Sequence, residues 1–172
     1  AFFLLVRLLP TLSALQVAFY QWDMLSDDRP FVGFGNFQRL AGDQVFVTAL
    51  LNTLKYVALG VPTGLALSLA IALALTRVQR LAGLFRTIYF TPFVTTLVAV
   101  AIVWKYLYHT RYGLFNYALG AIGIGPIDWL GDPHWAMPAI ILMAVWKGFG
   151  YNMLIFIAGL QAIPEDLYDA AE

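Results

Sequence analysis

Lys147 has the most unusual chemical setting of any side chain in this sequence. It stands about halfway along an otherwise apolar stretch, residues 135–160. A lysine at the centre of a membrane-spanning helix costs about 2.5–3.5 kcal/mol, so its ammonium group should face a cavity or find a partner rather than lipid. At about 100° per residue, one polar face of that helix carries Lys147, Gly148, Tyr151 and Asn152. The face could hydrogen-bond a polar solute in a translocation path, or it could only fix helix packing.

A second polar feature is a stripe of threonines in the stretch 87–106. Thr87, Thr91 and Thr95 repeat every four residues, with Pro92 between them. Proline leaves one backbone carbonyl without its usual donor, and threonine hydroxyls can satisfy local backbone groups in such a place. The stripe therefore favours local backbone bonding, and lining a polar path through the membrane is the alternative.

The sequence contains no group of residues that indicates enzymatic chemistry. The three lysines, Lys55, Lys105 and Lys147, all stand outside the G-x-x-x-x-G-K-[ST] pattern of a nucleotide site. His109 and His134 have no companions at metal-ligand spacing, and the sequence has no cysteine. Every Asp and Glu falls in a predicted loop or tail, which argues against a membrane-embedded enzyme. We expect no catalytic residue, no metal and no cofactor bound by this chain.

Composition indicates that these residues are positioned by helices in a lipid bilayer. Of 172 residues, 61% are hydrophobic and 12% are charged, against about 45–50% apolar and about 25% charged in a soluble domain. Ten basic and ten acidic residues cancel, so there is no basic footprint for nucleic acid. About 20 apolar residues are needed to cross the hydrocarbon core, and four stretches qualify: 1–20, 49–76, 87–106 and 135–160.

The sequence therefore predicts an all-α polytopic membrane protein, a single transmembrane domain over 1–172 with about four transmembrane helices. It opens inside an apolar run and closes within what reads as a helix, so we expect a fragment truncated at both ends. The loop 77–86 carries three arginines and no acid, whereas loops 21–48 and 107–134 carry two and one. By the positive-inside rule loop 77–86 is cytoplasmic, and so is the stretch 161–172.

Two further features suggest contacts between elements. Small residues recur every four positions in 49–76, which lets another helix approach closely; they are Gly60, Gly64, Ser68, Ala72 and Thr76. Static packing is the simpler interpretation, and a moving contact in a transport cycle is the alternative. After Pro164, two carboxylates stand where a helix N-terminus favours negative charge. This short helix could dock a soluble partner, or it could be a solvated turn between spans.

The stretch Ile163-Pro-Glu-Asp-Leu-Tyr-Asp-Ala-Ala-Glu172 resembles the opening of the EAA loop in type I ABC importer permeases, the binding-protein-dependent inner membrane components. Other motifs are similar to the carbohydrate and glycerol-3-phosphate branch in type and order. They include Trp22-Asp-Met-Leu-Ser26, Phe31-Val-Gly-Phe34, Asn52-Thr53, Phe85-Arg86-Thr87, Trp104-Lys105, Tyr112-Gly113-Leu114, Asp128-Trp129-Leu130-Gly131 and Trp146-Lys147-Gly148.

This resemblance implies a permease subunit in the bacterial cytoplasmic membrane that imports a small polar solute, a sugar or a related polyol or glycerol phosphate. Its implied partners are a second permease subunit, cytoplasmic ATP-binding subunits that hydrolyse ATP, and an extracytoplasmic solute-binding protein. The implied ATPase-coupling residues are Glu165, Asp166, Tyr168, Asp169, Ala170 and Ala171, with Asp169 where the family usually has Glu. The implied substrate path is Thr91, Thr95, Lys147, Gly148, Tyr151 and Asn152.

Two other interpretations remain open. Within the same family, the solute could be an amino acid or a peptide. An ion-coupled secondary transporter would also have proline-interrupted and glycine-interrupted spans and a mid-membrane charge. Such a transporter needs no docking helix, so the stretch 163–172 favours the importer.

Overall fold

The computed structural model describes residues 2–22, 28–76, 78, 81–164 and 166. They divide into two compact units, Ala1–Leu54 and Lys55–Glu172. The regular elements within the described ranges are helices, with one isolated antiparallel bridge between Tyr20 and Phe31.

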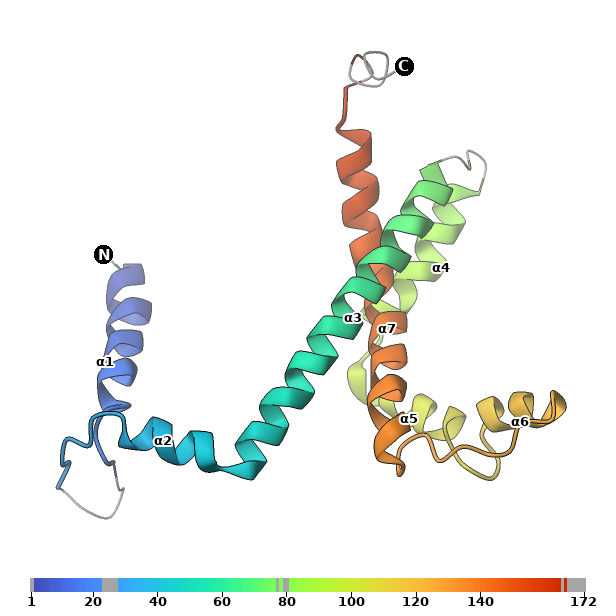
Figure 1. The fold of residues 1–172 in the computed structure, drawn as a ribbon. Helices are drawn as coiled ribbons and strands as arrows, with labels where there is room; N and C mark the ends of the chain where they lie inside the picture. Colours follow the sequence, from blue (N-terminus) through green and yellow to red (C-terminus); the bar gives the residue numbers. More distant parts are fainter. Residues whose placement is uncertain (1, 23–27, 77, 79–80, 165, 167–172) are drawn as a thin grey trace. The chain divides into compact units, whose positions relative to one another are not determined.

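Unit 1 begins with an apolar helical segment formed by η1 (Leu4–Leu8) and α1 (Leu9–Val17). In η1 the turn is widened, because Leu9 N–H donates to Leu4 O, five residues earlier. The two elements have 5 and 9 residues, fewer than the roughly 20 needed for a span, so the predicted span 1–20 stays a prediction. The short α2 (Gly35–Gly42) follows the Tyr20–Phe31 bridge, and Figure 1 draws these elements in blue.

The two longest helices contain two of the predicted spans. α3 (Gln44–Thr76) has 33 residues and contains the stretch 49–76, and α7 (Pro133–Gln161) has 29 residues and contains the stretch 135–160. Both are long and apolar enough to cross a membrane. Each continues through an internal proline, Pro62 in α3 and Pro138 in α7.

The predicted span 87–106 differs in the structure, because it is divided between two helices. α4 (Ala82–Val94) and α5 (Leu97–Leu107) meet at an angle of 96°. Thr95 and Thr96 between them are extended, with ψ of 139° and 141°, and this ends the hydrogen-bond ladder of α4. The described residues therefore contain two helices long enough to span a membrane, or three if the bent pair is one span. The total of about four transmembrane helices remains a prediction.

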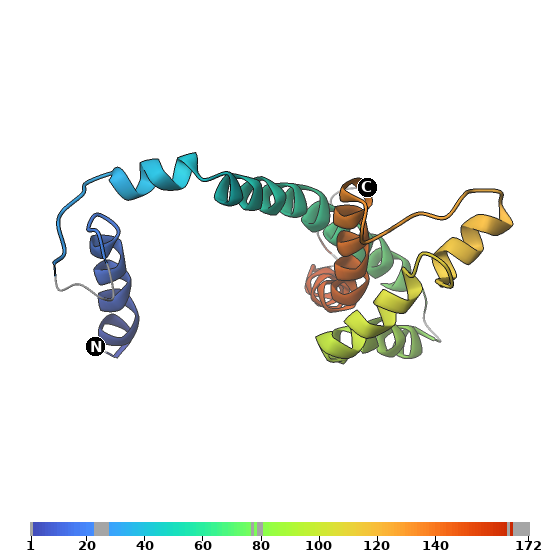
Figure 2. The same ribbon diagram turned by 90° about the horizontal axis from the view of Figure 1, so that it is seen from below.

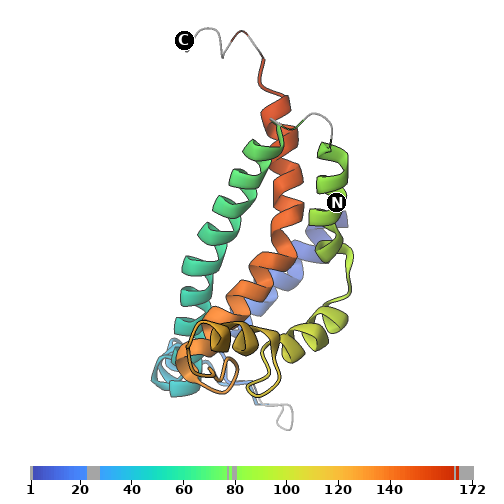
Figure 3. The same ribbon diagram turned by 90° about the vertical axis from the view of Figure 1, so that its right-hand side faces the viewer.

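Within unit 2, α4 lies beside α7, and α3 crosses α7 (Figure 1 and Figure 3). A buried cluster joins α3 and α7 near one end, formed by Ala72, Leu75, Met153 and Ile157. Phe85 and Tyr89 of α4 pack against it. The last turn of α3, the first turn of α4 and the last turn of α7 lie at this same end (Figure 3).

The opposite end of unit 2 holds α5, the short α6 (Leu114–Ala121) and the start of α7. Figure 2 shows an extended segment that leads from α6 back to α7. A second buried cluster ties α5 to α7 here; it consists of Val100, Trp104, Tyr108 and Ala139. The Tyr108 hydroxyl donates to Ala139 O at 2.7 Å. Burial raises the pKa of Tyr108 to about 12, so this phenol keeps its proton to a higher pH than an ordinary tyrosine, whose pKa is about 10.

Candidate functional site

The centre of the candidate site is the break between α4 and α5. The side-chain ammonium group of Lys147 of α7 lies there. The half-buried Lys147 places Nζ 3.2 Å from Pro92 O, 3.1 Å from Phe93 O and 2.8 Å from Thr95 O. An ammonium group has three N–H donors and no acceptor. Three carbonyl oxygens therefore match its full donor capacity. Carbonyls at a helix C-terminus lack intrahelical donors and carry the negative end of the helix dipole, so this position favours a cation.

The threonine stripe lies on α4 and bonds to the helix itself. Thr87 Oγ1 donates to Gly83 O at 3.1 Å, Thr91 Oγ1 to Thr87 O at 2.7 Å, and Thr95 Oγ1 to Thr91 O at 2.9 Å. Each hydroxyl proton is thus used four residues back along the chain, the local arrangement expected for threonine near a helix break. The hydroxyl oxygens of Thr91 and Thr95 keep their acceptor capacity.

Tyr151 lies one turn beyond Lys147 and stacks on Phe93 of α4. The ring centroids are 4.6 Å apart, and the rings are tilted by only 15°. Lys147 Nζ lies 6.0 Å from the centroid of the same Phe93 ring. Lys147 and Tyr151 therefore meet the same short segment of α4, its last turn.

Gly148 and Asn152 face α3 instead. They border a groove of about 180 Å³ between α3 and α7, together with Tyr56, Gly60 and Gly64. Adjacent residues on a helix are about 100° apart, so the four residues of this face can contact two different neighbouring helices. The structure divides the predicted polar face: Lys147 and Tyr151 meet α4, whereas Gly148 and Asn152 line the groove with α3.

Most of the small residues of α3 face α7, whereas Thr76 is exposed. Gly64 and Ser68 are buried, and Ser68 Oγ lies 2.6 Å from Gly64 O and 3.0 Å from Phe149 O of α7. A β-carbon at Gly60 or Gly64 would lie 3.8 Å from the nearest α7 side chain, which is ordinary van der Waals contact. Space at these two positions is therefore sufficient for alanine within the described residues.

Two residues with clear structural roles were missed by the sequence analysis. At Gly150 a β-carbon would collide with the carbonyl of Tyr89, so α4 and α7 need glycine there. Gly150 stands two residues from Gly148, and nothing in the sequence distinguishes which glycine meets α4. The other missed residue is Asn116 of α6, which is 8% exposed.

Asn116 holds the connection between α5 and α7. Its amide nitrogen donates to Thr110 O at 3.0 Å and to Ile127 O at 2.8 Å. Its amide oxygen accepts from Ile127 N at 3.1 Å and from Trp129 Nε1 at 2.9 Å. All of the hydrogen-bonding capacity of this amide is used.

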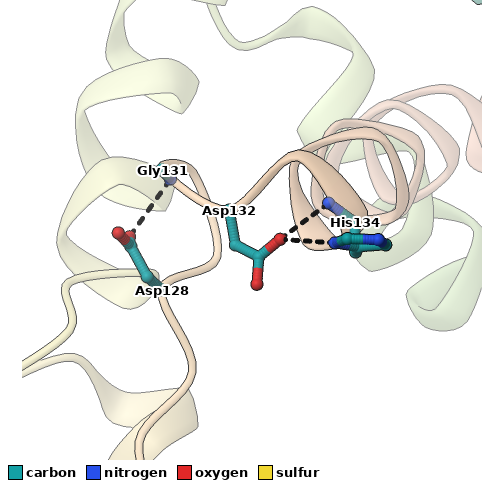
Figure 4. Close-up of polar contacts among 4 residues, drawn as sticks. All are labelled: Asp128, Gly131, Asp132 and His134. Carbon is teal, nitrogen blue, oxygen red and sulfur yellow. Dashed lines mark hydrogen bonds and ion pairs between the residues drawn. The ribbon is translucent and has the colours of Figure 1, made fainter.

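The chain enters α7 through a turn formed by the motif 128–131 and a capping aspartate (Figure 4). Asp128 Oδ1 accepts from Gly131 N at 3.1 Å. Asp132 Oδ1 accepts from the His134 backbone N–H at 2.8 Å, and the His134 ring Nδ1 lies 3.0 Å away. The backbone hydrogen bond from His134 makes the largest contribution to lowering the pKa of Asp132, and the interaction with the His134 ring lowers it further. A carboxylate at the N-cap satisfies a free N–H of the first turn of α7.

The predicted coupling residues fall at the end of the described chain. Glu165, Tyr168, Asp169, Ala170 and Ala171 lie outside the described residues. Asp166 is described and exposed, three positions beyond Ile163. The prediction of a coupling helix therefore stays a prediction.

These features define a class of protein: an all-α polytopic membrane protein whose apolar helices carry partly polar faces. Residues 60–172 match the family described as binding-protein-dependent transport system inner membrane component. The chain belongs to this family of transport permeases, as the resemblance predicted.

Similar proteins come from several microorganisms. A probable ABC transporter permease protein, YurN, of Bacillus subtilis is 32% identical over 98% of this chain and 59% of its own length. The trehalose/maltose permease protein MalF of Thermococcus litoralis is 33% identical over 95% of this chain and 56% of its own length. The lactose permease protein LacF of Rhizobium radiobacter is 42% identical over 83% of this chain and 48% of its own length.

A solved structure has the same fold. In a bacterial ABC transporter involved in the import of the acidic polysaccharide alginate, one chain aligns with a TM-score of 0.79 and 27% identity, over 99% of this chain and 57% of that chain. The chain thus spans about half the length of the relatives and the structure that it matches.

Proposed function

We propose that this chain forms part of the permease subunit of an ATP-binding-cassette importer for a sugar, or for a related polyol or glycerol phosphate. The observation that carries the proposal is the 42% identity to a lactose transport permease over 83% of this chain. Relatives named for trehalose/maltose and diacetylchitobiose support the same solute class. We place the subunit in the bacterial cytoplasmic membrane, crossing it several times.

The proposed solute path follows the faces of α4 and α7. Tyr151 is 45% exposed and Phe93 42% exposed, so the stacked pair presents ring surface and a phenol hydroxyl. Thr91 and Thr95 offer acceptor oxygens, and the Asn152 amide offers further hydrogen bonds along the groove, where Gly148 leaves space beside it. Aromatic surface and neutral hydrogen-bonding groups suit a polyhydroxylated solute. Lys147 borders this path, and its donors already bind backbone.

The proposed partners follow from the family, which depends on binding proteins. A second permease subunit completes the path, an extracytoplasmic solute-binding protein delivers the solute, and ATP-binding subunits hydrolyse ATP on the cytoplasmic side. The chain itself is a transport subunit without catalysis or a cofactor of its own. The stretch 163–172 docks the ATPase, and solute crosses as the permease halves alternate between outward-open and inward-open states.

Uptake by the assembled importer tests this proposal. The full-length permease is expressed with its genomic neighbours, and cells are given labelled lactose, maltose, trehalose, glycerol phosphate, amino acids or peptides. We expect uptake of one of the sugars or polyols that stops on ATP depletion and survives collapse of the proton gradient. We also expect Ala170→Arg to abolish uptake while ATP hydrolysis continues, because a bulky charge would disturb the docking helix.

Each contrary result identifies another function. Uptake that follows an ion gradient and ignores ATP would make the protein a secondary transporter. Uptake restricted to amino acids or peptides would keep the importer and reject the solute class. Normal coupling in Ala170→Arg would remove the docking role of 163–172.

A further inference from the structure

We propose that Lys147 is a positioning residue, whose ammonium group replaces the missing backbone donors at the break between α4 and α5 and so fixes that break. The role belongs to the architecture of the permease, and only its transport consequence rests on the proposed function.

The break creates a need for hydrogen-bond donors. Because Thr95 and Thr96 are extended, Pro92 O and Phe93 O belong to the last carbonyls of α4, which have no donor in their own helix. Pro92 is buried. Unpaired carbonyls at membrane depth are strongly unfavourable, and broken helices persist there only where protein groups satisfy them.

Lys147 meets that need better than a neutral side chain could. Its Nζ lies within 3.2 Å of all three carbonyl oxygens, and its charge complements the negative end of α4. Among the described residues no carboxylate lies within 4.0 Å of this ammonium. Its burial is thus compensated by backbone carbonyls rather than by an ion pair.

The contact also sets the position of the aromatic pair next to it. Phe93 O binds Lys147, and the Phe93 ring stacks on Tyr151, one turn further along α7. The backbone carbonyl and the ring of Phe93 therefore both contact the same face of α7. A change at Lys147 should move the Phe93–Tyr151 pair, which borders the proposed solute path, without removing a solute contact.

A distance measurement across the break tests the proposal. This chain has no cysteine, so spin labels can be placed at Ile88→Cys in α4 and Ile102→Cys in α5, in a full-length permease otherwise free of cysteine. Both side chains are exposed, at 52% and 54%. Pulsed electron paramagnetic resonance then gives the distribution of distances between the labels, and no solute is required.

We expect Lys147→Met, which keeps the length and removes the donors, to broaden this distribution or shift it by several ångströms. Lys147→Arg retains several N–H donors and the charge, so it should restore a narrow distribution near that of the parent. Lys105→Met is the matched control, because Lys105 is an exposed residue of α5 itself. The control should leave the distribution unchanged.

An unchanged distribution in Lys147→Met would overturn the proposal. If Lys147→Met does not reach the membrane, the same pair is measured in Lys147→Ala, which also removes every donor. A parental distribution there would equally overturn the proposal, and a broadened one would support it.

Uptake kinetics separate positioning from direct solute binding. For a positioning residue, Lys147→Met should lower the maximal uptake rate about tenfold with little change in the half-saturating concentration. A raised half-saturating concentration with unchanged label distances would instead make Lys147 a solute ligand. The distance measurement needs no solute. The positioning role of Lys147 can therefore be tested even if the proposed function is wrong.

Discussion

At Gly150, α7 passes so close to α4 that a side chain has no room. A β-carbon there would meet the Tyr89 carbonyl and come within 3.1 Å of Phe90 Cα. Both are backbone atoms, which cannot move aside as the end of a flexible side chain can. Single residues thus set the spacing of these helices, and the contact of Lys147 with the end of α4 requires that spacing.

We therefore predict that Gly150→Ala destabilises the permease. The added methyl group must push α4 away from α7, and overpacking of this kind costs about 1–3 kcal/mol. The midpoint of thermal unfolding of the full-length permease in detergent should fall accordingly. Gly159→Ala is the control, since it lies in the same helix with nothing within 4 Å of the new methyl group. Equal midpoints for the two variants would contradict the close approach at Gly150.

At the scale of elements, a single amide organises the connection from α5 to α7. Asn116 binds the backbone of Thr110, which precedes α6, and of Ile127 in the segment that joins α6 to α7, where it also binds the indole of Trp129. Trp129 in turn packs against the cluster that ties α5 to α7. The position of α6 therefore depends on groups that lie before and after it in the chain.

We predict that Asn116→Leu loosens this connection while the membrane helices stay folded. The substitution leaves four groups without their partner: Thr110 O, Ile127 N–H, Ile127 O and the Trp129 indole N–H. Each buried group left unsatisfied costs about 1–3 kcal/mol, and water reaching the loop should recover part of that. Hydrogen exchange of the backbone amides in 110–129 should accelerate, and exchange in α7 should not.

Tyr117→Leu provides the comparison for this experiment. It changes the next residue of α6, whose side chain is 78% exposed, and it removes no hydrogen bond of Asn116. Exchange in 110–129 that is equally fast in both variants, or equally slow, would show that Asn116 does not hold the connection.

The elements also show how far sequence reasoning reaches. α3 and α7 follow from length and hydropathy, because an uninterrupted apolar run has few alternatives to a helix in lipid. The break between α4 and α5 does not follow from Pro92, because Pro62 and Pro138 lie within continuous helices. The groups that bind the freed carbonyls come from Lys147, more than 50 positions away in the chain.

The polar face of α7 shows the same limit for the candidate site. Helical periodicity groups Lys147, Gly148, Tyr151 and Asn152 correctly on neighbouring parts of one helix. It cannot tell that two of them meet α4 while the others line the groove with α3. That division depends on which helices pack on either side, and the packing depends on close contacts such as the one at Gly150.

On the scale of the whole molecule, the orientation in the membrane decides which partners each end of unit 2 can reach. The end of α3, the start of α4 and the end of α7 lie together (Figure 3), and the stretch 163–172 follows α7 in the sequence. Arg86 lies near the start of α4 at this end, and the positive-inside rule predicts that this end is cytoplasmic. The same prediction places α6 and its connection to α7 on the outside, the side of the proposed solute-binding protein.

Thiol labelling tests this orientation directly. Gly125 lies in the connection between α6 and α7, and Gly83 lies in the first turn of α4; a side chain at either meets nothing within 4 Å. In intact spheroplasts a membrane-impermeant maleimide should label Gly125→Cys and spare Gly83→Cys, and both should react after permeabilisation. The reverse pattern would place 163–172 outside the cell, where it could not meet an ATP-hydrolysing subunit, and would overturn the importer together with the orientation.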